Sequence, residues 1–327
     1  MTASLVKGVL EKDRMSIARA ITLVESSNPD HQKQASELLD ALLPYSGKSI
    51  RVGISGTPGV GKSTFIEALG LWLIGNNQQV AVLAVDPTSP MTKGSLLGDK
   101  TRMQRLSLNP SAYIRPSPTQ GVLGGVAAKT REAMVVCEAA GFDVILVETV
   151  GVGQSEIAVV SMVDTFILLI QPGSGDELQG IKKGILELAD ILVVNKADGE
   201  LEWLADLAKS QYARAFFLLR RAQGQPWKTP VIKASALESK GIVEIWKQVE
   251  SHRAHLEFAE GISKKRSKQA EQWFWNRVEA GLLDNFKKDP KVASALPLLL
   301  EQVKNNRMSV SHAVSILLSS DKPGRIP

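Results

Sequence analysis

The chain has 327 residues, of which 44% are hydrophobic, so it is long and apolar enough to bury a sizeable core. Its single cysteine, Cys137, excludes an internal disulfide framework and a cysteine-cluster metal site, and it favours a reducing compartment. The net charge is +5, but the basic cluster at 264–268 lacks the interleaved aromatic residues that stack on bases. We therefore expect no nucleic-acid partner.

Targeting and membrane segments are not evident. The first fourteen residues mix charges with short apolar stretches, so a signal peptide is not expected. The strongest apolar runs, FILLI and ILVV, are too short to span a bilayer. We expect a cytoplasmic protein with no membrane partner.

Residues 1–46 are expected to form an N-terminal helical extension. Ile17, Ala20, Ile21 and Val24 share one helical face, and a second apolar face runs from Ala35 to Leu43. The stretch SSNPD at 26–30 is typical of a turn between two helices. These helices should pack on the main domain.

Residues 47–259 are expected to form an α/β domain. Six short runs rich in Val and Ile read as buried strands: IRVGIS, QVAVLAV, DVILVE, TFILLI, DILVVN and PVIKAS. Longer amphipathic segments separate them, near 62–75, 124–140, 177–188 and 236–256. This alternation predicts a doubly wound, mainly parallel sheet. Residues 260–327 are expected to be helices outside the sheet, near 260–288, 291–305 and 309–319.

The segment GTPGVGKST at 56–64 follows the first predicted strand and opens a helix, as a P-loop does. Glycines let successive N–H groups face phosphate oxygens, and the helix N-terminus adds a positive field. Lys62 should reach the β- and γ-phosphates, and the Ser63 hydroxyl should ligate Mg²⁺. The segment predicted to hold the nucleotide phosphates comprises Gly56, Thr57, Pro58, Gly59, Val60, Gly61, Lys62, Ser63 and Thr64.

The segment NKAD at 195–198 ends another predicted strand, where ligands of open α/β sheets bind. The Asp198 carboxylate can accept hydrogen bonds from guanine N1–H and its exocyclic amine, which adenine does not offer in that arrangement. Asn195 would brace the base-binding loops, and the stem of Lys196 would cover the ring. A backbone N–H at Ser235, Ala236 or Leu237, after the next strand, could meet the guanine O6. GTP and GDP are the expected ligands.

Acidic residues follow two further strands. Asp86 ends a strand and can approach Mg²⁺; the alternative is a helix cap or turn residue. Asp99 lies in a long polar loop and could orient the attacking water or touch the metal, although a surface role is an equal alternative. In ETVGVGQSE at 148–156, Glu148 should face the Mg²⁺ shell beside the P-loop strand. The Gly151 N–H should lie near a γ-phosphate oxygen, which would make the loop a nucleotide switch.

Together the motifs GTPGVGKST, DPTSP, GDKTRM, ETVGVGQSE, GDELQGIKKG and NKAD resemble the cytoplasmic MeaB/ArgK GTPases over the whole chain. That resemblance implies a chaperone of an adenosylcobalamin-dependent acyl-CoA mutase, with methylmalonyl-CoA mutase or a relative such as isobutyryl-CoA mutase as client. It also implies a homodimer whose C-terminal helices form a dimerisation arm, and a mobile segment at 173–184 in which Asp176, Glu177 and Lys182 carry the nucleotide state to the partner.

Two departures from the wider GTPase pattern bear on mechanism. Val152 stands where small signalling GTPases have a water-orienting Gln, and Gln154 lies two residues further on, so we expect slow hydrolysis that a partner accelerates. Nickel-inserting relatives carry His- or Cys-rich metal sites, whereas this chain has only four His and one Cys. His252 and His255 could bind a metal in principle, but a solvated helix face is expected instead, so we expect that the chain does not carry the metal itself.

Two other functions fit parts of the pattern. A kinase or transport ATPase would use the P-loop but would not need a guanine-reading Asp198. A scaffold with a vestigial nucleotide site would not need Lys62, Ser63 and Asp86 intact.

Overall fold

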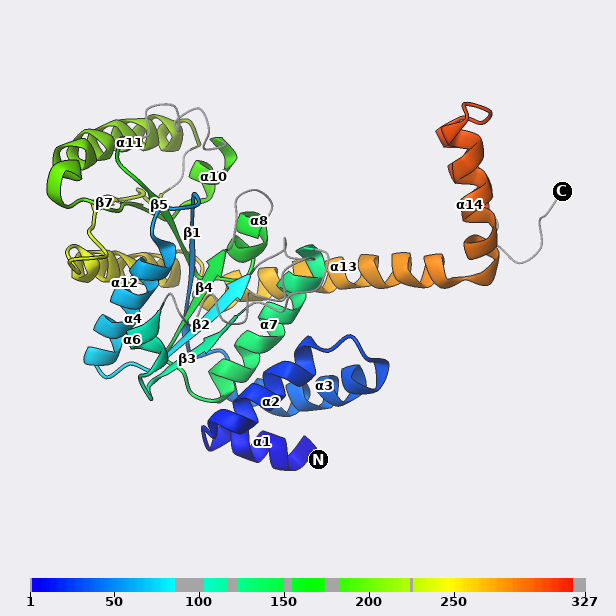
Figure 1. The fold of residues 1–327 in the computed structure, drawn as a ribbon, viewed down its shortest axis with the longest axis horizontal. Coiled ribbons are helices and arrows are strands. Elements are labelled where there is room, and N and C mark those ends of the chain that lie inside the picture. The colour runs from blue at the N-terminus through cyan, green and yellow to red at the C-terminus, as the bar shows by residue number, and fades with distance from the viewer. Residues whose placement is uncertain are drawn as a thin grey trace. The chain divides into compact units, whose positions relative to one another are not determined.

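The computed structural model describes residues 2–85, 103–116, 123–149, 155–173, 183–223 and 226–319. By its contacts the chain divides into two compact units, residues 1–266 and 267–327. The first unit holds the sheet and the helices that cover it (Figure 1).

Seven parallel strands form a single sheet in the order β3-β2-β4-β1-β5-β6-β7. The strands are β1 (Ile50–Gly56), β2 (Val80–Val85), β3 (Ala112–Arg115), β4 (Val144–Thr149), β5 (Thr165–Ile170), β6 (Ile191–Val194) and β7 (Val231–Lys233). The P-loop strand β1 lies at the centre between β4 and β5, and every residue of β4 and β5 is buried. Helices on both faces explain why these strands read as continuous apolar runs.

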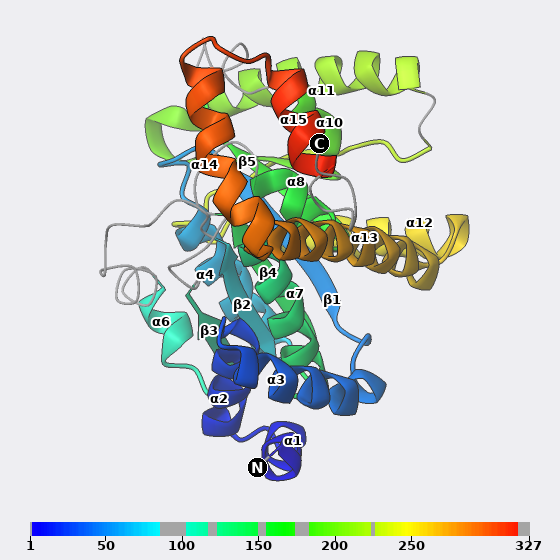
Figure 2. The same cartoon turned by 90° about the vertical axis from the view of Figure 1, so that its right-hand side faces the viewer.

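Helices cover both faces of the sheet. One face packs against α4 (Lys62–Gly75), α6 (Gln104–Ser107) and α12 (Ile242–Ala259). The other packs against α1 (Thr2–Leu10), α2 (Arg14–Glu25), α3 (Pro29–Leu42), α7 (Leu123–Ala139), α8 (Ser155–Val160), α10 (Lys183–Leu188) and α11 (Glu202–Gln223). Figure 2 shows α11 and the N-terminal helices α1–α3 at opposite ends of this unit, as Figure 1 does.

The N-terminal helices share a core with the α/β domain. Ile17, Ile21 and Leu38 are fully buried or nearly so, in one cluster with residues of α7 and the sheet. Asp13 caps α2 through the Ser16 N–H, and Asn28 caps α3, which begins at Pro29 inside the expected turn.

The predicted α/β fold is confirmed, and all six expected strands are present. The elements that were not expected include the edge strand β3, the short helices α6 and α8, and the long helix α11. β3 reads AYIR and contains a single Ile and no Val, so it lacks the Val- and Ile-rich pattern by which the other strands were recognised.

The second unit contains the rest of α13 (Ile262–Lys288) followed by α14 (Pro290–Lys304) and α15 (Val310–Ser319). Asp289 caps α14 by accepting from the N–H groups of Lys291 and Val292. Within the described ranges, no helix has the length and apolarity needed to cross a membrane.

Candidate nucleotide-binding site

The predicted site residues gather at the carboxyl edge of the sheet, where ligands bind in doubly wound folds. The P-loop follows β1, Glu148 lies near the end of β4, Asn195 follows β6, and Ser235 follows β7. Four segments far apart in sequence therefore meet around one loop.

The phosphate loop depends on glycine at the start of α4. Gly59 and Gly61 have φ of 82° and 91°, in the left-handed region that other residues rarely adopt. A Cβ on Gly61 would also lie 2.9 Å from the Asn195 Nδ2. Glycine at 61 thus lets the loop turn into the helix and lets Asn195 approach it.

Lys62 and Thr57 place polar groups inside this loop. The Lys62 Nζ donates to the carbonyls of Gly56 at 2.7 Å and Thr57 at 3.2 Å. The Thr57 Oγ1 is buried and makes no hydrogen bond within the part of the chain that the structure describes. A buried hydroxyl of this kind is a polar group that a ligand can satisfy.

Ser63 and Glu148 meet across the first turn of α4. The Ser63 Oγ donates to the Glu148 Oε1 at 3.3 Å, and Glu148 is 4% exposed. Glu148 is paired in register with Ile54 of β1 and Ala84 of β2, so its strand lies beside the P-loop strand, as expected. A hydroxyl and a carboxylate oxygen are the hard ligands that Mg²⁺ prefers, so this pair fits the metal.

Asn195 connects the phosphate loop to the segment after β7. Its Nδ2 donates to the Val60 carbonyl at 2.8 Å, and its Oδ1 accepts from the Ala236 N–H at 3.2 Å. The side chain is 1% exposed. One buried amide therefore holds the two loops between which a bound nucleotide would extend.

Asp198 is held by the same segment. Its Oδ2 accepts a hydrogen bond from the Ser235 hydroxyl, which also accepts from the Glu238 N–H at 3.1 Å. The Lys196 Nζ donates to the Gln171 Oε1 at 3.3 Å, and the Leu237 side chain is 80% exposed. Only a backbone role was expected for Ser235, because the sequence does not show that its side chain lies beside Asp198.

Several predicted residues lie outside the described ranges, and the structure says nothing of their position. They are Asp86, Asp99, Gly151, Val152, Gln154, Asp176, Glu177 and Lys182.

The expectation that His252 and His255 form a solvated helix face is wrong for His252. This residue is 3% exposed; its Nδ1 hydrogen-bonds the Thr165 hydroxyl at 2.9 Å, and its Nε2 lies 3.4 Å from the Asp190 Oδ1. The Trp227 ring packs 4.8 Å from the His252 ring. Burial lowers the pKa of His252 below its ordinary value, and the charge of Asp190 offsets part of this effect.

An ion-pair cluster at the opposite, amino edge of the sheet was also missed. Arg266 of α13 donates from Nε and Nη2 to the two carboxylate oxygens of Asp164, at 2.8 and 2.7 Å, and from Nη2 to the Ser49 carbonyl. Burial alone would raise the pKa of Asp164, but the hydrogen bonds and charge of Arg266 outweigh it and lower the pKa. The first turns of α13 are thus fixed to the α/β unit.

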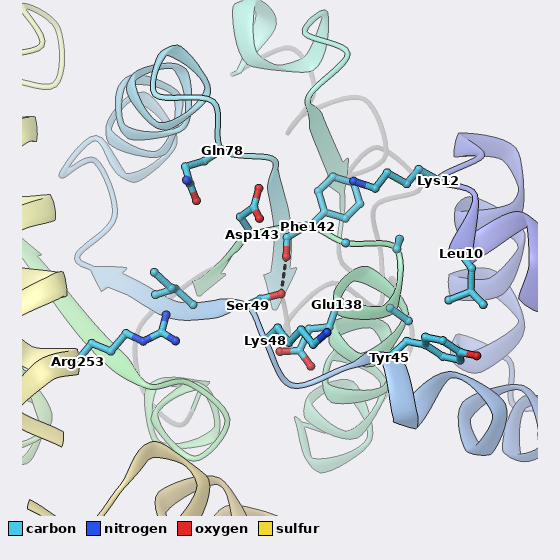
Figure 3. Close-up of a pocket in the computed structure, with 14 residues that line it drawn as sticks. Leu10, Lys12, Tyr45, Lys48, Ser49, Gln78, Glu138, Phe142, Asp143 and Arg253 are labelled. Carbon is cyan, nitrogen blue, oxygen red and sulfur yellow. Dashed lines mark hydrogen bonds between the residues drawn. The ribbon is translucent and has the colours of Figure 1, made fainter. Parts of the chain in front are cut away.

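A pocket of about 630 Å³ lies at this amino edge, away from the predicted nucleotide site (Figure 3). Lys12, Lys48 and Arg253 line it, together with the C-terminal end of α7. None of the predicted phosphate or guanine contacts is among its lining residues. The pocket therefore plays no part in the nucleotide site.

This chain matches one protein-family model and is similar to proteins that are described as GTPases. The family described as "Methylmalonyl Co-A mutase-associated GTPase MeaB" matches residues 17–291. A "Probable GTPase" of Mycobacterium tuberculosis is 52% identical over 314 residues, which covers 96% of this chain and 93% of the relative. "GTPase ArgK" of Escherichia coli is 45% identical over 307 residues, covering 94% and 92%.

A solved structure is also similar over nearly its whole length. The protein described as "LAO/AO transport system kinase" superposes with a TM-score of 0.78 and is 38% identical, covering 97% of this chain and 96% of that one.

Proposed function

Because this chain belongs to the MeaB family of methylmalonyl-CoA mutase-associated GTPases, we propose that it is a GTP-hydrolysing chaperone that gates adenosylcobalamin loading and protects its client. The client would be an acyl-CoA mutase that uses adenosylcobalamin, and methylmalonyl-CoA mutase is the main candidate. GTP hydrolysis is the activity of the family; the gating role is the proposal. The single cysteine, Cys137, is buried, and we keep the cytoplasm as the proposed location.

The contact between Ser63 and Glu148 is the observation that best supports a coupled switch. Ser63 belongs to the proposed phosphate loop, whereas Glu148 is the last residue but one of β4, the strand that precedes residues 150–154. A ligand that engages both side chains would couple phosphate binding to the position of that segment. Coupling of this kind is how nucleotide-dependent proteins report the presence of a γ-phosphate.

The proposed roles follow the chemistry of each side chain. Lys62 would place its ammonium on the β- and γ-phosphates, and the loop N–H groups would hold the remaining phosphate oxygens. Ser63, Asp86, Asp99 and Glu148 would hold Mg²⁺, which when bound neutralises phosphate charge. Asp198 would read guanine, with Ser235 fixing its carboxylate. Asp176, Glu177 and Lys182 would face the client.

Slow hydrolysis that the client accelerates is part of this proposal. Val152 stands at the position where small GTPases have a Gln that orients the attacking water. Its side chain has no group that can do so. Asp99 or a residue of the client would then complete the site.

Single-turnover hydrolysis of GTP, with and without a purified cobalamin-dependent acyl-CoA mutase, tests the proposal. We expect a faster rate with the mutase, and a slower rate of adenosylcobalamin transfer when a non-hydrolysable GTP analogue is bound. The mutase is not the client if the hydrolysis rates are equal with and without it and if the rate of adenosylcobalamin transfer is the same whichever nucleotide is bound. A pull-down with the same analogue would then identify the partner.

A homodimer through the C-terminal helices is also proposed. Four large apolar side chains of α13 are more than half exposed: Phe274, Trp275, Leu282 and Leu283. Further exposed apolar side chains follow on α14 and α15, including Leu298, Val310 and Leu318. Their burial against a second chain would remove a large apolar area from water. Replacing Leu282 and Leu283 by Glu should yield monomers in sedimentation velocity at micromolar concentration.

A second candidate, a kinase that transfers the γ-phosphate, is favoured by one observation. The similar solved structure is described as a transport-system kinase. Asp198 and its Ser235 partner argue against this candidate, since an ATP-dependent kinase does not need a guanine-reading pair. Competition of ATP and GTP for the site distinguishes the two: stronger binding of ATP would support the kinase.

A further inference from the structure

The outward face of α11 is unusually apolar for a helix at the surface. Its inner face packs on the sheet through Ala205, Ala208, Tyr212 and Phe216. Its outer face exposes 65% of Trp203, 49% of Leu207, and 66% each of Phe217 and Leu218. A helix that is apolar on both sides is typical of one that is covered on both sides.

Other surface helices of the same unit do not share this feature. Among the described residues of 2–266, no other helix exposes more than two large apolar side chains; α12 exposes Val243 and Phe258. Three of the four on α11 are also aligned. Trp203, Leu207, Ser210, Arg214 and Phe217 are spaced alternately by four and three residues, which keeps them on one helical face.

This face is complementary to itself. Its apolar residues form two groups, Trp203 with Leu207 and Phe217 with Leu218, on either side of the small residue Ser210. The acidic residues of the helix, Glu202 and Asp206, precede Ser210, whereas Arg214 follows it. An antiparallel copy turned about a two-fold axis at Ser210 would bring the two groups together through Trp203 and Phe217.

We infer that the outer face of α11 is a contact between two copies of this chain, paired antiparallel about Ser210. In that register Trp203 packs on Phe217 of the second copy, and Asp206 lies opposite its Arg214, since both pairs are equidistant from residue 210. Asp206 bonds the Lys233 Nζ within its own chain at 2.7 Å, and its side chain is still 62% exposed, so its carboxylate can accept a second cation. Small Ser210 lets the two helices approach closely.

The contact is expected to be weak by itself. One helix face per copy falls in the small interface class, below about 1,200 Å² in total, which is typical of transient association. It would act with the proposed C-terminal interface by joining dimers into larger assemblies. It does not depend on the client or on the rate of GTP hydrolysis.

Cross-linking at the two-fold axis tests the inference in the full-length chain. Helix axes about 8–10 Å apart bring Cα atoms at the axis to within the roughly 4.4–6.8 Å that a disulfide requires. We expect Ser210→Cys to form disulfide-linked dimers under mild oxidation much faster than Lys209→Cys. Lys209 is also exposed on the same helix but faces about 100° away, so it controls for random collision and for dimers formed elsewhere. The native Cys137 is fully buried.

A charge swap tests the register. In the Ser210→Cys background, Asp206→Arg should slow cross-linking, because it places two arginines opposite each other. Adding Arg214→Asp should restore the rate, although it cannot restore the bond to Lys233 within the chain. Unchanged binding of a fluorescent GDP analogue would show that each variant is folded.

With GDP binding intact, two results would overturn the inference. One is a Ser210→Cys cross-linking rate no faster than that of Lys209→Cys. That result would mean that a second copy of the chain does not bind this face. The other is a double swap that stays as slow as the single one.

Discussion

The side-chain amide of Asn195 donates to the main-chain carbonyl of Val60 over 2.8 Å, although the two residues are 135 positions apart. The same side chain accepts from the Ala236 N–H. One side chain therefore joins the loop before α4 to the segment after β7.

Replacing Asn195 by Ala should weaken binding of both GDP and GTP. The change leaves a buried carbonyl and a buried N–H without partners, at a cost of about 1–3 kcal/mol each, and it frees the two loops. Titration with a fluorescent GDP analogue measures the effect. Asn195→Asp is the matched variant: it keeps the acceptor for Ala236 but not the donor to Val60. Equal affinity of the Ala variant and the native chain would contradict the bracing role.

Lys62→Ala should abolish GTP hydrolysis and weaken nucleotide binding. The ammonium lies inside the phosphate loop on the carbonyls of Gly56 and Thr57, and no other group of the loop can supply its positive charge. Phosphate release and equilibrium binding measure the two effects. The exposed Lys209→Ala serves as a control for the loss of a lysine. Turnover retained by the Lys62 variant would refute the phosphate assignment.

Asp198→Asn should move the preference from guanosine to xanthosine nucleotides. An amide can donate to the xanthine O2, where the carboxylate accepts from the guanine amine. Competition between GDP and xanthosine diphosphate measures the change. Ser235→Ala should lower the affinity for GDP without altering this preference, because it removes only the support of the carboxylate. A variant at 198 that still prefers guanosine would mean that another group reads the base.

Arg266→Ala should lower the free energy of unfolding by about 3–5 kcal/mol, as expected when one partner of a buried ion pair is removed. The Asp164 side chain is only 1% exposed and would lose its bidentate partner. Urea unfolding measures the change. Any truncation of the C-terminal helices should therefore end after Arg266, not near residue 262. Arg253→Ala, also on the amino edge, is the control and should cost less than about 1 kcal/mol, as ordinary surface changes do.

The buried His252 should make the protein less stable in acid. Its pKa is lowered in the folded state, so the unfolded chain binds the proton more readily once the pH falls below the ordinary value of 6.5. The penalty is absent above that pH and grows as the pH falls towards the folded pKa. Urea midpoints at several pH values from neutral to mildly acidic measure it, and His252→Gln should show a shallower decline between them. An unchanged slope in the variant would assign the acid sensitivity to other groups.

Features of the fold could be predicted from the sequence when they depend on residues that are close together in the chain. The strand–loop–helix order around GTPGVGKST and the apolar runs were readable because hydrogen bonding and burial impose their patterns on neighbouring residues. Helix α11 was overlooked because apolar residues on both faces obscure the single stripe of an ordinary surface helix.

The sequence alone predicted the parallel α/β architecture, from the alternation of apolar runs and amphipathic segments, and the two segments proposed to bind the nucleotide phosphates and guanine, each from one short contiguous stretch. Only the tertiary structure decided that Glu148 meets Ser63, that Asn195 holds Val60, that His252 is buried against Asp190, and that Asp164 binds Arg266. The physical reason is that these contacts join residues far apart in the chain. The order in which the strands pair and the packing of helices on the sheet decide which of these residues meet. The spacing of residues within any one motif predicts neither.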